Sequence, residues 1–152
     1  MSSLKVLLID ADMDHGGLSK KFTADEAPGL VDLVDDESLA FQQVVREIGP
    51  GNLCLLPRGT NARPGDLYRF EAVERVINEA ASQFDLIFVD GADANSIARF
   101  ADHLIWVVES EKTRREVVVA GLAKMDGVGD KTLGVILNKR KFYIPHWLYS
   151  RL

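Results

Sequence analysis

Two aspartates that end apolar runs indicate the chemistry this chain could perform. Residues 5–12 read KVLLIDAD and residues 84–90 read FDLIFVD, so Asp10 and Asp90 each follow a short hydrophobic strand candidate. Asp12 stands two positions beyond Asp10. Carboxylates at the carboxyl ends of parallel strands can hold a magnesium ion together with the phosphates of a substrate. The pattern therefore predicts a phosphate and magnesium site at one edge of a sheet.

Aspartates at strand ends can also have a simpler role, because they accept hydrogen bonds from the amides of a following turn or helix. We favour this capping role for Asp14, Asp25 and Asp93, and the binding role for the three aspartates named above. His15 follows Asp14, but no second His or Cys stands at ligand spacing, so a solvated loop is the better interpretation.

A phosphate-binding loop of the form GxxxxGK[ST] does not occur in the sequence. Residues 127–132 read GVGDKT, but Asp130 separates Gly129 from Lys131, and a strand candidate follows where a helix should begin. We interpret this segment as an ordinary loop.

The elements that must position these residues alternate between short apolar runs and longer amphipathic stretches. The strand candidates are residues 5–11, 52–59, 85–91, 103–110 and 133–139, and the helix candidates are residues 66–84 and 113–125. Strands that are apolar throughout are covered on both faces, which is typical of parallel sheets. The prediction is an α/β fold with a mostly parallel sheet flanked by helices, in one domain spanning residues 1–152.

Composition excludes several classes of protein. The chain has 152 residues, of which 47% are hydrophobic and 27% charged, and this balance indicates a globular domain. A net charge of -5 argues against a general nucleic-acid binder. The single cysteine, Cys54, lies in an apolar run and is expected to be a buried thiol. No apolar run approaches the length of about 18 residues that spans a bilayer, and we expect a cytoplasmic location.

Several segments, in their order along the chain, resemble bacterial tyrosine kinases of exopolysaccharide and capsule assembly, which are related to the MinD and ParA ATPases. LKVLLIDAD resembles the Walker A′ segment of that family and FDLIFVDGAD its Walker B segment. The other segments are GLVDLV, NLCLLPRG, HLIWVVESEKTRRE and LGVILNKRKFYIPHWLY. The resemblance covers almost the whole chain and implies a deviant-Walker P-loop NTPase fold without the N-terminal P-loop unit.

The resemblance implies roles for four residues. Asp10 and Asp12 match the catalytic Walker A′ pair, and Asp10 and Asp90 match the magnesium ligands. Asn138 matches the asparagine that contacts the adenine of ATP. Phosphoryl transfer depends mainly on positioning and charge neutralisation, which carboxylates and Mg²⁺ can supply on this side of a site.

The chain departs from the family pattern in ways that bear on activity. The phosphate loop and its lysine lie upstream of Walker A′ in the family. Residues 13–17 (MDHGG) replace the usual arginines and proline, and residues 91–93 (GAD) replace Thr-Pro-Pro. Only Tyr143 and Tyr149 remain of a tyrosine-rich tail. We therefore expect no kinase activity from this chain alone, because preorganised phosphate-binding groups supply much of the stabilisation of the transition state.

The absent strand would lie beside the Walker B strand and would leave unpaired backbone edges. Either the remaining strands close the gap, another polypeptide supplies the strand, or the chain is a fragment of a longer protein. The resemblance also implies a separate inner-membrane chain-length regulator or adaptor as partner, assembly into homo-oligomers, and a place at the inner face of the membrane.

The sequence leaves open two alternative functions and two placements of the C-terminal tail. A non-catalytic regulatory or assembly module would keep the MinD and ParA fold without transferring phosphate. A receiver-like phospho-acceptor domain is a minor alternative, because the strand ending at Asp90 comes later than an acceptor strand should. The tail of residues 142–152 either packs back on the sheet or docks on a partner or the bilayer surface.

Overall fold

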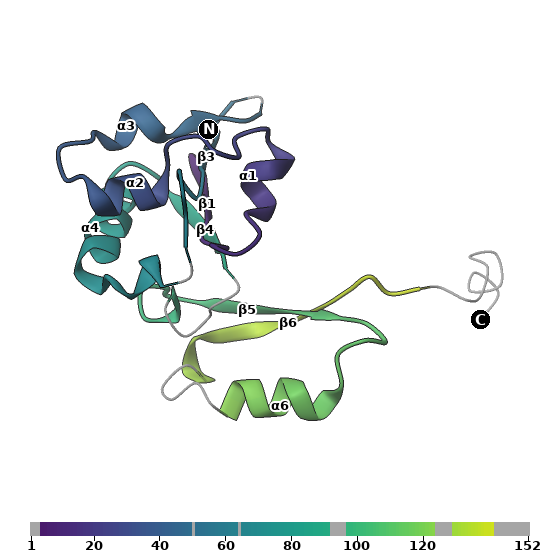
Figure 1. The fold of residues 1–152 in the computed structure, drawn as a ribbon. Helices are drawn as coiled ribbons and strands as arrows, with labels where there is room; N and C mark the ends of the chain where they lie inside the picture. Colours follow the sequence, from purple (N-terminus) through teal and green to yellow (C-terminus); the bar gives the residue numbers. More distant parts are fainter. Residues whose placement is uncertain (1–3, 50, 64, 92–96, 124–128, 142–152) are drawn as a thin grey trace. The chain divides into compact units, whose positions relative to one another are not determined.

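The structure of this chain is a computed structural model that describes residues 4–49, 51–63, 65–91, 97–123 and 129–141 (Figure 1). It forms two compact units, Met1–Phe100 and Ala101–Leu152, called unit 1 and unit 2 here. The interpretation of residues 1–152 as a single domain stays a prediction.

Unit 1 is built on a sheet of four strands. They are β1 (Val6–Asp10), β2 (Arg46–Glu47), β3 (Leu53–Leu56) and β4 (Leu86–Asp90), in the spatial order β2-β3-β1-β4. β3 and β4 both run parallel to the central strand β1, whereas β2 is antiparallel to β3. The three apolar runs expected to be strands in this unit are confirmed. β2 was not expected, because two exposed charged residues carry no apolar signal.

The core of unit 1 lies between one face of this sheet and the helices α2 (Leu30–Asp35), α3 (Phe41–Val44) and α4 (Phe70–Ala81). Leu7 and Ile9 of β1 are fully buried in it, and Ile87 and Val89 of β4 pack against its margin. Cys54 of β3 is a buried free thiol, as expected.

The helix expected over residues 66–84 is confirmed in part. A 3-10 turn, η1 (Asp66–Tyr68), comes first, and the chain then passes through Arg69, at φ −80° and ψ 65°, before α4 begins. α4 follows the apolar spacing, since it buries Val73, Val76 and Ala80. Three short helices, α1 (Gly17–Lys21), α2 and α3, were not expected from the sequence, because helices of four to six residues are too short to show a periodic pattern.

Unit 2 consists of a parallel pair of strands with helical segments between them. The elements are β5 (Leu104–Glu109), α6 (Arg115–Ala123), η2 (Gly129–Lys131) and β6 (Thr132–Asn138). Both strands and the helix were expected. The 3-10 turn η2 leads into β6, so the described part of GVGDKT is a turn before a strand, as the sequence analysis concluded. None of the described residues of unit 2 is buried.

The fold is therefore α/β with a mostly parallel sheet and helices, as predicted. The described strands nevertheless form two sheets, in which β4 pairs only with β1 and β5 only with β6. Backbone pairing among the described strands thus leaves one edge of β4 without a neighbour.

Candidate functional site

The register of the parallel sheet brings Asp10 and Asp90 together. Asp10 ends β1, Asp90 ends β4, and the two residues are direct partners across the strands. Partners in adjacent parallel strands direct their side chains to the same face, so the two carboxylates share one face at the carboxyl edge of the sheet. The amide of Ala11 donates to the carbonyl oxygen of Asp90 at 2.7 Å, which extends the pairing past the strand ends. The roles predicted for these two residues stay predictions.

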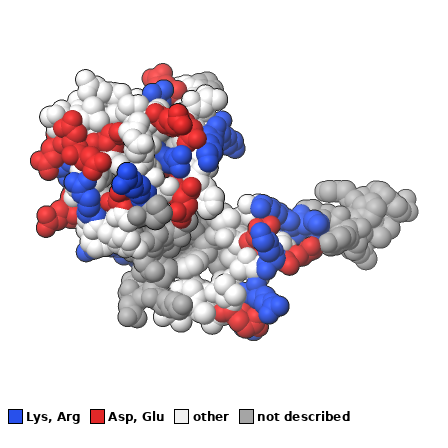
Figure 2. Space-filling model, in the orientation of Figure 1, with Lys and Arg blue, Asp and Glu red and all other residues white. Residues whose placement is uncertain are grey.

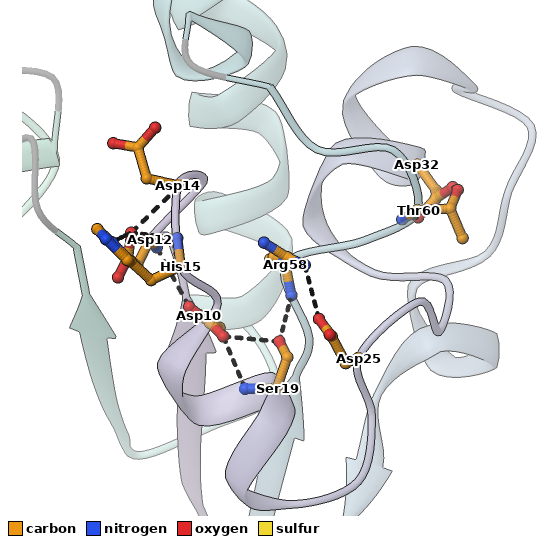
Figure 3. Close-up of polar contacts among 9 residues, drawn as sticks. All are labelled: Asp10, Asp12, Asp14, His15, Ser19, Asp25, Asp32, Arg58 and Thr60. Carbon is orange, nitrogen blue, oxygen red and sulfur yellow. Dashed lines mark hydrogen bonds and ion pairs between the residues drawn. The ribbon is translucent and has the colours of Figure 1, made fainter.

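Asp10 is fully buried, and its carboxylate is already bonded (Figure 3). Oδ2 of Asp10 accepts hydrogen bonds from the hydroxyl of Ser19 at 2.6 Å and from the amide of Ser19 at 2.7 Å. Oδ1 accepts a longer bond of 3.2 Å from the amide of Asp12. Because Ser19 is the third residue of α1, Asp10 satisfies an amide of the first turn that has no partner within the helix.

Asp12 organises the loop that follows β1. Its Oδ1 accepts hydrogen bonds from the amides of Asp14 at 3.2 Å and His15 at 3.0 Å. The ring of His15 also lies within 3.4 Å of Oδ1, although the His15 side chain is 80% exposed. The capping role expected of Asp14 is therefore filled by Asp12, while His15 lies in an exposed loop as expected. The Asp12 side chain, 18% exposed, still reaches solvent.

Asp90 shows the electrostatic character of this edge. Partial desolvation, and then the negative charges of Asp10 and Asp12, raise the pKa of Asp90 above its ordinary value. In the described part of the chain no Lys or Arg forms an ion pair with these three aspartates. Among the described residues, no Lys or Arg therefore offsets their negative charge by an ion pair, and such a setting favours binding of an external cation.

The aspartates do not form a complete metal site by themselves. Among the described residues, no group of three or more His, Cys, Asp or Glu side chains is arranged to hold a metal ion. Magnesium is commonly held by one or two carboxylates, with phosphate oxygens and water completing its shell. The donor set at this edge fits such a shared ion.

Arg58 is a polar residue of this region that the sequence analysis missed. It follows β3, and its Nη2 donates to Oδ1 of Asp25 at 2.7 Å. The Arg58 amide donates to the Ser19 hydroxyl at 3.0 Å, so Ser19 connects Arg58 to Asp10. Arg58 Nε is buried without a hydrogen-bond partner among the described residues. The one signal in the sequence that could have identified Arg58 is its position in a loop with proline and glycine directly after a predicted strand.

The absence of a side chain at Gly16 leaves room for the Arg58 guanidinium. A Cβ at Gly16 would lie 2.6 Å from Nε of Arg58, and Gly16 has a positive φ of 59°. A side chain at this position would therefore be strained and would displace the guanidinium.

A second polar cluster fixes α2. Oδ2 of Asp32 accepts hydrogen bonds from the amides of Gly29 at 2.8 Å and Thr60 at 2.9 Å, and Oδ1 accepts one from the Thr60 hydroxyl. Figure 3 shows Asp32 and Thr60 apart from the chain of contacts that runs from Asp10 to Asp25. This cluster stabilises the loop after β3 and supplies no group to the carboxylate edge.

Asn138 ends β6 in unit 2. Its side-chain Oδ1 accepts a hydrogen bond of 2.8 Å from the amide of Lys139, whose φ is +54°. The adenine-binding role implied for Asn138 stays a prediction. Asp93, Tyr143, Tyr149 and the tail of residues 142–152 lie outside the described residues.

The surface of the chain carries both signs of charge. On the face that Figure 2 shows, Lys and Arg side chains are interspersed with Asp and Glu. Within the described ranges, no helix has both the length and the apolar character needed to span a membrane.

Comparison with known proteins identifies the relatives of this chain. No family model matches it. The chain is 31% identical over 148 residues to the succinoglycan biosynthesis transport protein ExoP of Rhizobium meliloti, with 91% of this chain and 19% of that protein covered. It is 26% identical over 142 residues to the putative tyrosine-protein kinase CapB of Staphylococcus aureus, with 89% of this chain and 62% of CapB covered. The chain thus spans less than two thirds of either relative.

Solved structures agree on the fold. The kinase domain of the Escherichia coli tyrosine kinase ETK superposes with a TM-score of 0.77 at 23% identity, covering 93% of this chain and 59% of that one. A chain of the MinC:MinD cell division protein complex of Aquifex aeolicus gives a TM-score of 0.64 at 22% identity, covering 98% of this chain and 60% of that one. The homologues are therefore bacterial tyrosine kinases and exopolysaccharide transport proteins, and the structural neighbours include kinase domains together with ParA and MinD ATPases.

Proposed function

We propose that this chain acts in exopolysaccharide or capsule biosynthesis, as a relative of the tyrosine autokinases that regulate polymer chain length and export. The observation that carries the proposal is the pair of carboxylates at the ends of β1 and β4. Asp10 and Asp90 are partners in register, and the pKa of Asp90 is raised by desolvation and then by the charges of Asp10 and Asp12. Carboxylates placed together in this way are suited to hold Mg²⁺, with phosphate oxygens and water completing its shell.

The three aspartates at this edge differ in burial, and we propose different roles for them accordingly. Asp90 is exposed and Asp12 reaches solvent, so these two carboxylates are the ones that would contact Mg²⁺ directly. Asp10 lies beneath them, bonded to Ser19, and contributes its charge and the position of the loop. The predicted role of Asp10 as a metal ligand stays a prediction, and we propose Asp12 as a further ligand. Magnesium ATP would bring phosphate oxygens to complete the shell, and Asn138 is proposed for the adenine.

We do not expect these 152 residues alone to transfer a phosphoryl group. The residues supply carboxylates, which can hold a cation and orient an attacking hydroxyl. The sequence contains no GxxxxGK[ST] segment to bind the phosphates. We propose that the chain contributes the magnesium side of a site whose phosphate side it does not carry.

Titration calorimetry with Mg²⁺ and with Mg²⁺-ATP tests this proposal. Asp90→Asn should weaken binding by about tenfold or more, since it removes a charged ligand. Asp14→Asn is the matched control, because Asp14 is exposed and lies outside the group formed by Asp10, Asp12 and Asp90; it should leave affinity within about twofold. Equal weakening by both variants would mean that bulk charge, not this site, attracts the ion.

A second candidate is a non-catalytic regulatory or assembly module, and the burial of Asp10 favours it. A carboxylate whose Oδ2 accepts two bonds from Ser19 can be retained for the fold alone. If the folded chain binds neither Mg²⁺ nor Mg²⁺-ATP, and Asp10→Asn only lowers stability, the module is the better description.

We also propose a partner and a location from the relatives. ExoP is named as a transport protein of polysaccharide biosynthesis, and a chain-length regulator or adaptor at the inner membrane is the corresponding partner for this chain. A cytoplasmic position at the inner face of the membrane and assembly into homo-oligomers complete the proposal.

A further inference from the structure

Two segments rich in Lys and Arg begin side by side at the carboxyl end of the strand pair in unit 2. Glu109 and Asn138 end β5 and β6 and are partners in register. The amide of Ser110 donates to the carbonyl oxygen of Asn138 at 2.9 Å, so the pairing continues one residue past β5. Glu111 and Lys139 have positive φ angles of 65° and 54°, which turn the chain just after each strand.

Glu109 joins the two segments through their lysines. Its Oε2 lies 3.3 Å from Nζ of Lys112, and its Oε1 lies 3.3 Å from Nζ of Lys139. The hydrogen bond from Lys139 is the largest cause of a lowered pKa of Glu109, and the bond from Lys112 adds to it. One carboxylate thus holds ammonium groups from two different segments at the same place.

The two segments carry more cations than this carboxylate can offset. Six exposed side chains form a group called the basic cluster here: Lys112, Arg114, Arg115, Lys139, Arg140 and Lys141. The acidic residues among them are Glu109, Glu111 and Glu116, so the basic cluster keeps an excess of three positive charges. Figure 2 shows Lys and Arg side chains close to one another in this part of unit 2, with acidic side chains among them.

The stability of α6 does not explain the two arginines of the basic cluster. α6 begins at Arg115, and Arg114 directly precedes it. The amino end of a helix carries a partial positive charge, so cations there are unfavourable for the helix, and only Glu116 in the first turn offsets them. Neither arginine forms an ion pair with a described residue. These charges therefore indicate an anion outside the chain.

The distribution of charge along the chain sets unit 2 apart. Unit 1 contains seventeen Asp and Glu against nine Lys and Arg, whereas unit 2 contains six against nine. Such an asymmetry between two parts of a chain is typical of contact with a nucleic acid or an anionic membrane surface. Salt screens charges beyond about 8 Å, so the basic cluster can be attracted to an anionic surface although the whole chain is acidic.

Exposed apolar side chains next to the basic cluster favour the membrane surface. Val117 is 61% exposed and follows Arg115 by two positions, and Leu137 is 55% exposed and precedes Lys139 by two positions. Cations beside apolar side chains suit the interface of a bilayer, where charged headgroups meet acyl chains. A nucleic acid offers phosphates without such an apolar layer, and the net charge of -5 argues against it.

We propose that the basic cluster binds the anionic headgroups of a phospholipid bilayer, so that unit 2 contacts the membrane surface directly. Clusters of about four to eight Lys and Arg bind such surfaces through the lipid phosphates. The inference rests on the proposed function for its location at the inner face of the membrane, but it requires neither Mg²⁺ nor nucleotide. It assigns the contact to residues 112–115 and 139–141, not to residues 142–152.

Sedimentation of the full chain with vesicles, in the absence of Mg²⁺ and nucleotide, tests this inference. Vesicles of phosphatidylcholine with about one third phosphatidylglycerol should pellet the chain, whereas vesicles of phosphatidylcholine alone should not. Raising the salt concentration from about 0.1 M to about 0.5 M should weaken binding by about tenfold or more, because salt screens the cations from the headgroups.

The double variant Arg114→Gln, Arg115→Gln tests the basic cluster from the side of the protein. Removal of two cations should weaken binding to the anionic vesicles by about tenfold or more. The double variant Lys20→Gln, Lys21→Gln is the matched control, because it removes the same charge from exposed residues of α1 in unit 1. It should bind within about twofold of wild type. Circular dichroism establishes that both variants are folded.

Three results would overturn the inference. The first is a folded wild-type chain that anionic vesicles do not pellet. The second is equal binding by Arg114→Gln, Arg115→Gln, which would assign the contact to another part of the chain. The third is a fluorescein-labelled single-stranded DNA that binds as tightly as the vesicles do, which would make the basic cluster a general polyanion site. Loss of Mg²⁺-ATP binding in Asp90→Asn would leave vesicle binding unchanged, so the two proposals fail separately.

Discussion

Ser19 is the residue on which the polar interior of unit 1 depends. It is fully buried, donates its hydroxyl and its amide to Asp10, and accepts the amide of Arg58. A buried carboxylate is tolerated only when its oxygens are bonded, so the bonds from Ser19 are what allow Asp10 to be buried.

Ser19→Ala should lower the free energy of unfolding by about 2 kcal/mol, because it removes a hydrogen bond to a charged group and leaves the Arg58 amide unpaired. Urea denaturation measures the change. Ser82→Ala is the control, since the Ser82 hydroxyl bonds only the exposed end of α4, and it should cost less than about 1 kcal/mol. Equal losses in both variants would contradict a special role for Ser19.

Asp90 makes stability depend on pH in a direction that can be derived. Its pKa in the folded chain lies above the ordinary value of 3.8, so the folded state holds the proton more firmly than the unfolded state does. The free energy of unfolding should therefore fall as pH rises from about 3.8 through the raised pKa. The penalty is absent below this window and complete above it.

Asp90→Asn should remove that penalty. At pH 7 the variant should be more stable than wild type, by less than about 1 kcal/mol because Asp90 is exposed and screened by solvent. The difference should vanish below pH 3.8. Urea titrations of both proteins across this range measure it, with Asp14→Asn as a control for net charge. A gain that does not change with pH would show that Asp90 is not the titrating group.

At the scale of elements, α2 is fixed by the loop that follows β3. The amides of Leu30 and Val31 donate to the carbonyls of Pro57 and Arg58, at 2.8 Å and 3.0 Å. These bonds satisfy first-turn amides that the helix itself cannot pair. The contact requires Gly29, because a Cβ there would overlap the carbonyl oxygen of Pro57.

Gly29→Ala should therefore destabilise unit 1 by about 2 kcal/mol, as overpacking in a tight site does. Gly17→Ala offers a contrast, because a Cβ at Gly17 meets nothing within 4 Å and lies in α1. That variant should be neutral or up to about 1 kcal/mol more stable, from its higher helix propensity. Thermal melts of the two variants measure the difference, and similar effects would contradict the steric account.

The elements that sequence could predict were those with a continuous apolar signal. β1, β3 and β4 are apolar except for the aspartates that end β1 and β4, and their parallel arrangement alone brings Asp10 and Asp90 to one edge. The chain of contacts through Ser19 to Arg58 could not be predicted, because it depends on a five-residue helix without a periodic pattern. The break at Arg69 could not be predicted either, because the 3-10 turn η1 before it has only three residues and shows no pattern that separates it from α4.

At the scale of the whole molecule, the two units differ in how they are held together. Unit 1 has a contiguous core, whereas none of the described residues of unit 2 is buried. A pair of strands with one helix buries little apolar area, so its local stability should be low. Ile105, Val107 and Leu133 are among its exposed hydrophobic residues.

Limited proteolysis of the full chain should show this difference. Within the described ranges, trypsin should cut first in unit 2, for example at Lys112 and Arg114, which are exposed in the segment between β5 and α6. Mass spectrometry of the early fragments identifies the sites. A first cut between β1 and α4, with residues 101–141 intact, would contradict the expectation.

The single thiol of the chain allows the opening of unit 1 to be followed over time. Cys54 is 7% exposed in the middle of the sheet of unit 1. Its pKa is raised by burial and then by the charge of Glu47, which makes the reactive thiolate scarcer. An alkylating reagent can therefore modify Cys54 only when β3 is uncovered. Because the chain has no other cysteine, the rate of alkylation reports the opening of unit 1 alone, without any added label.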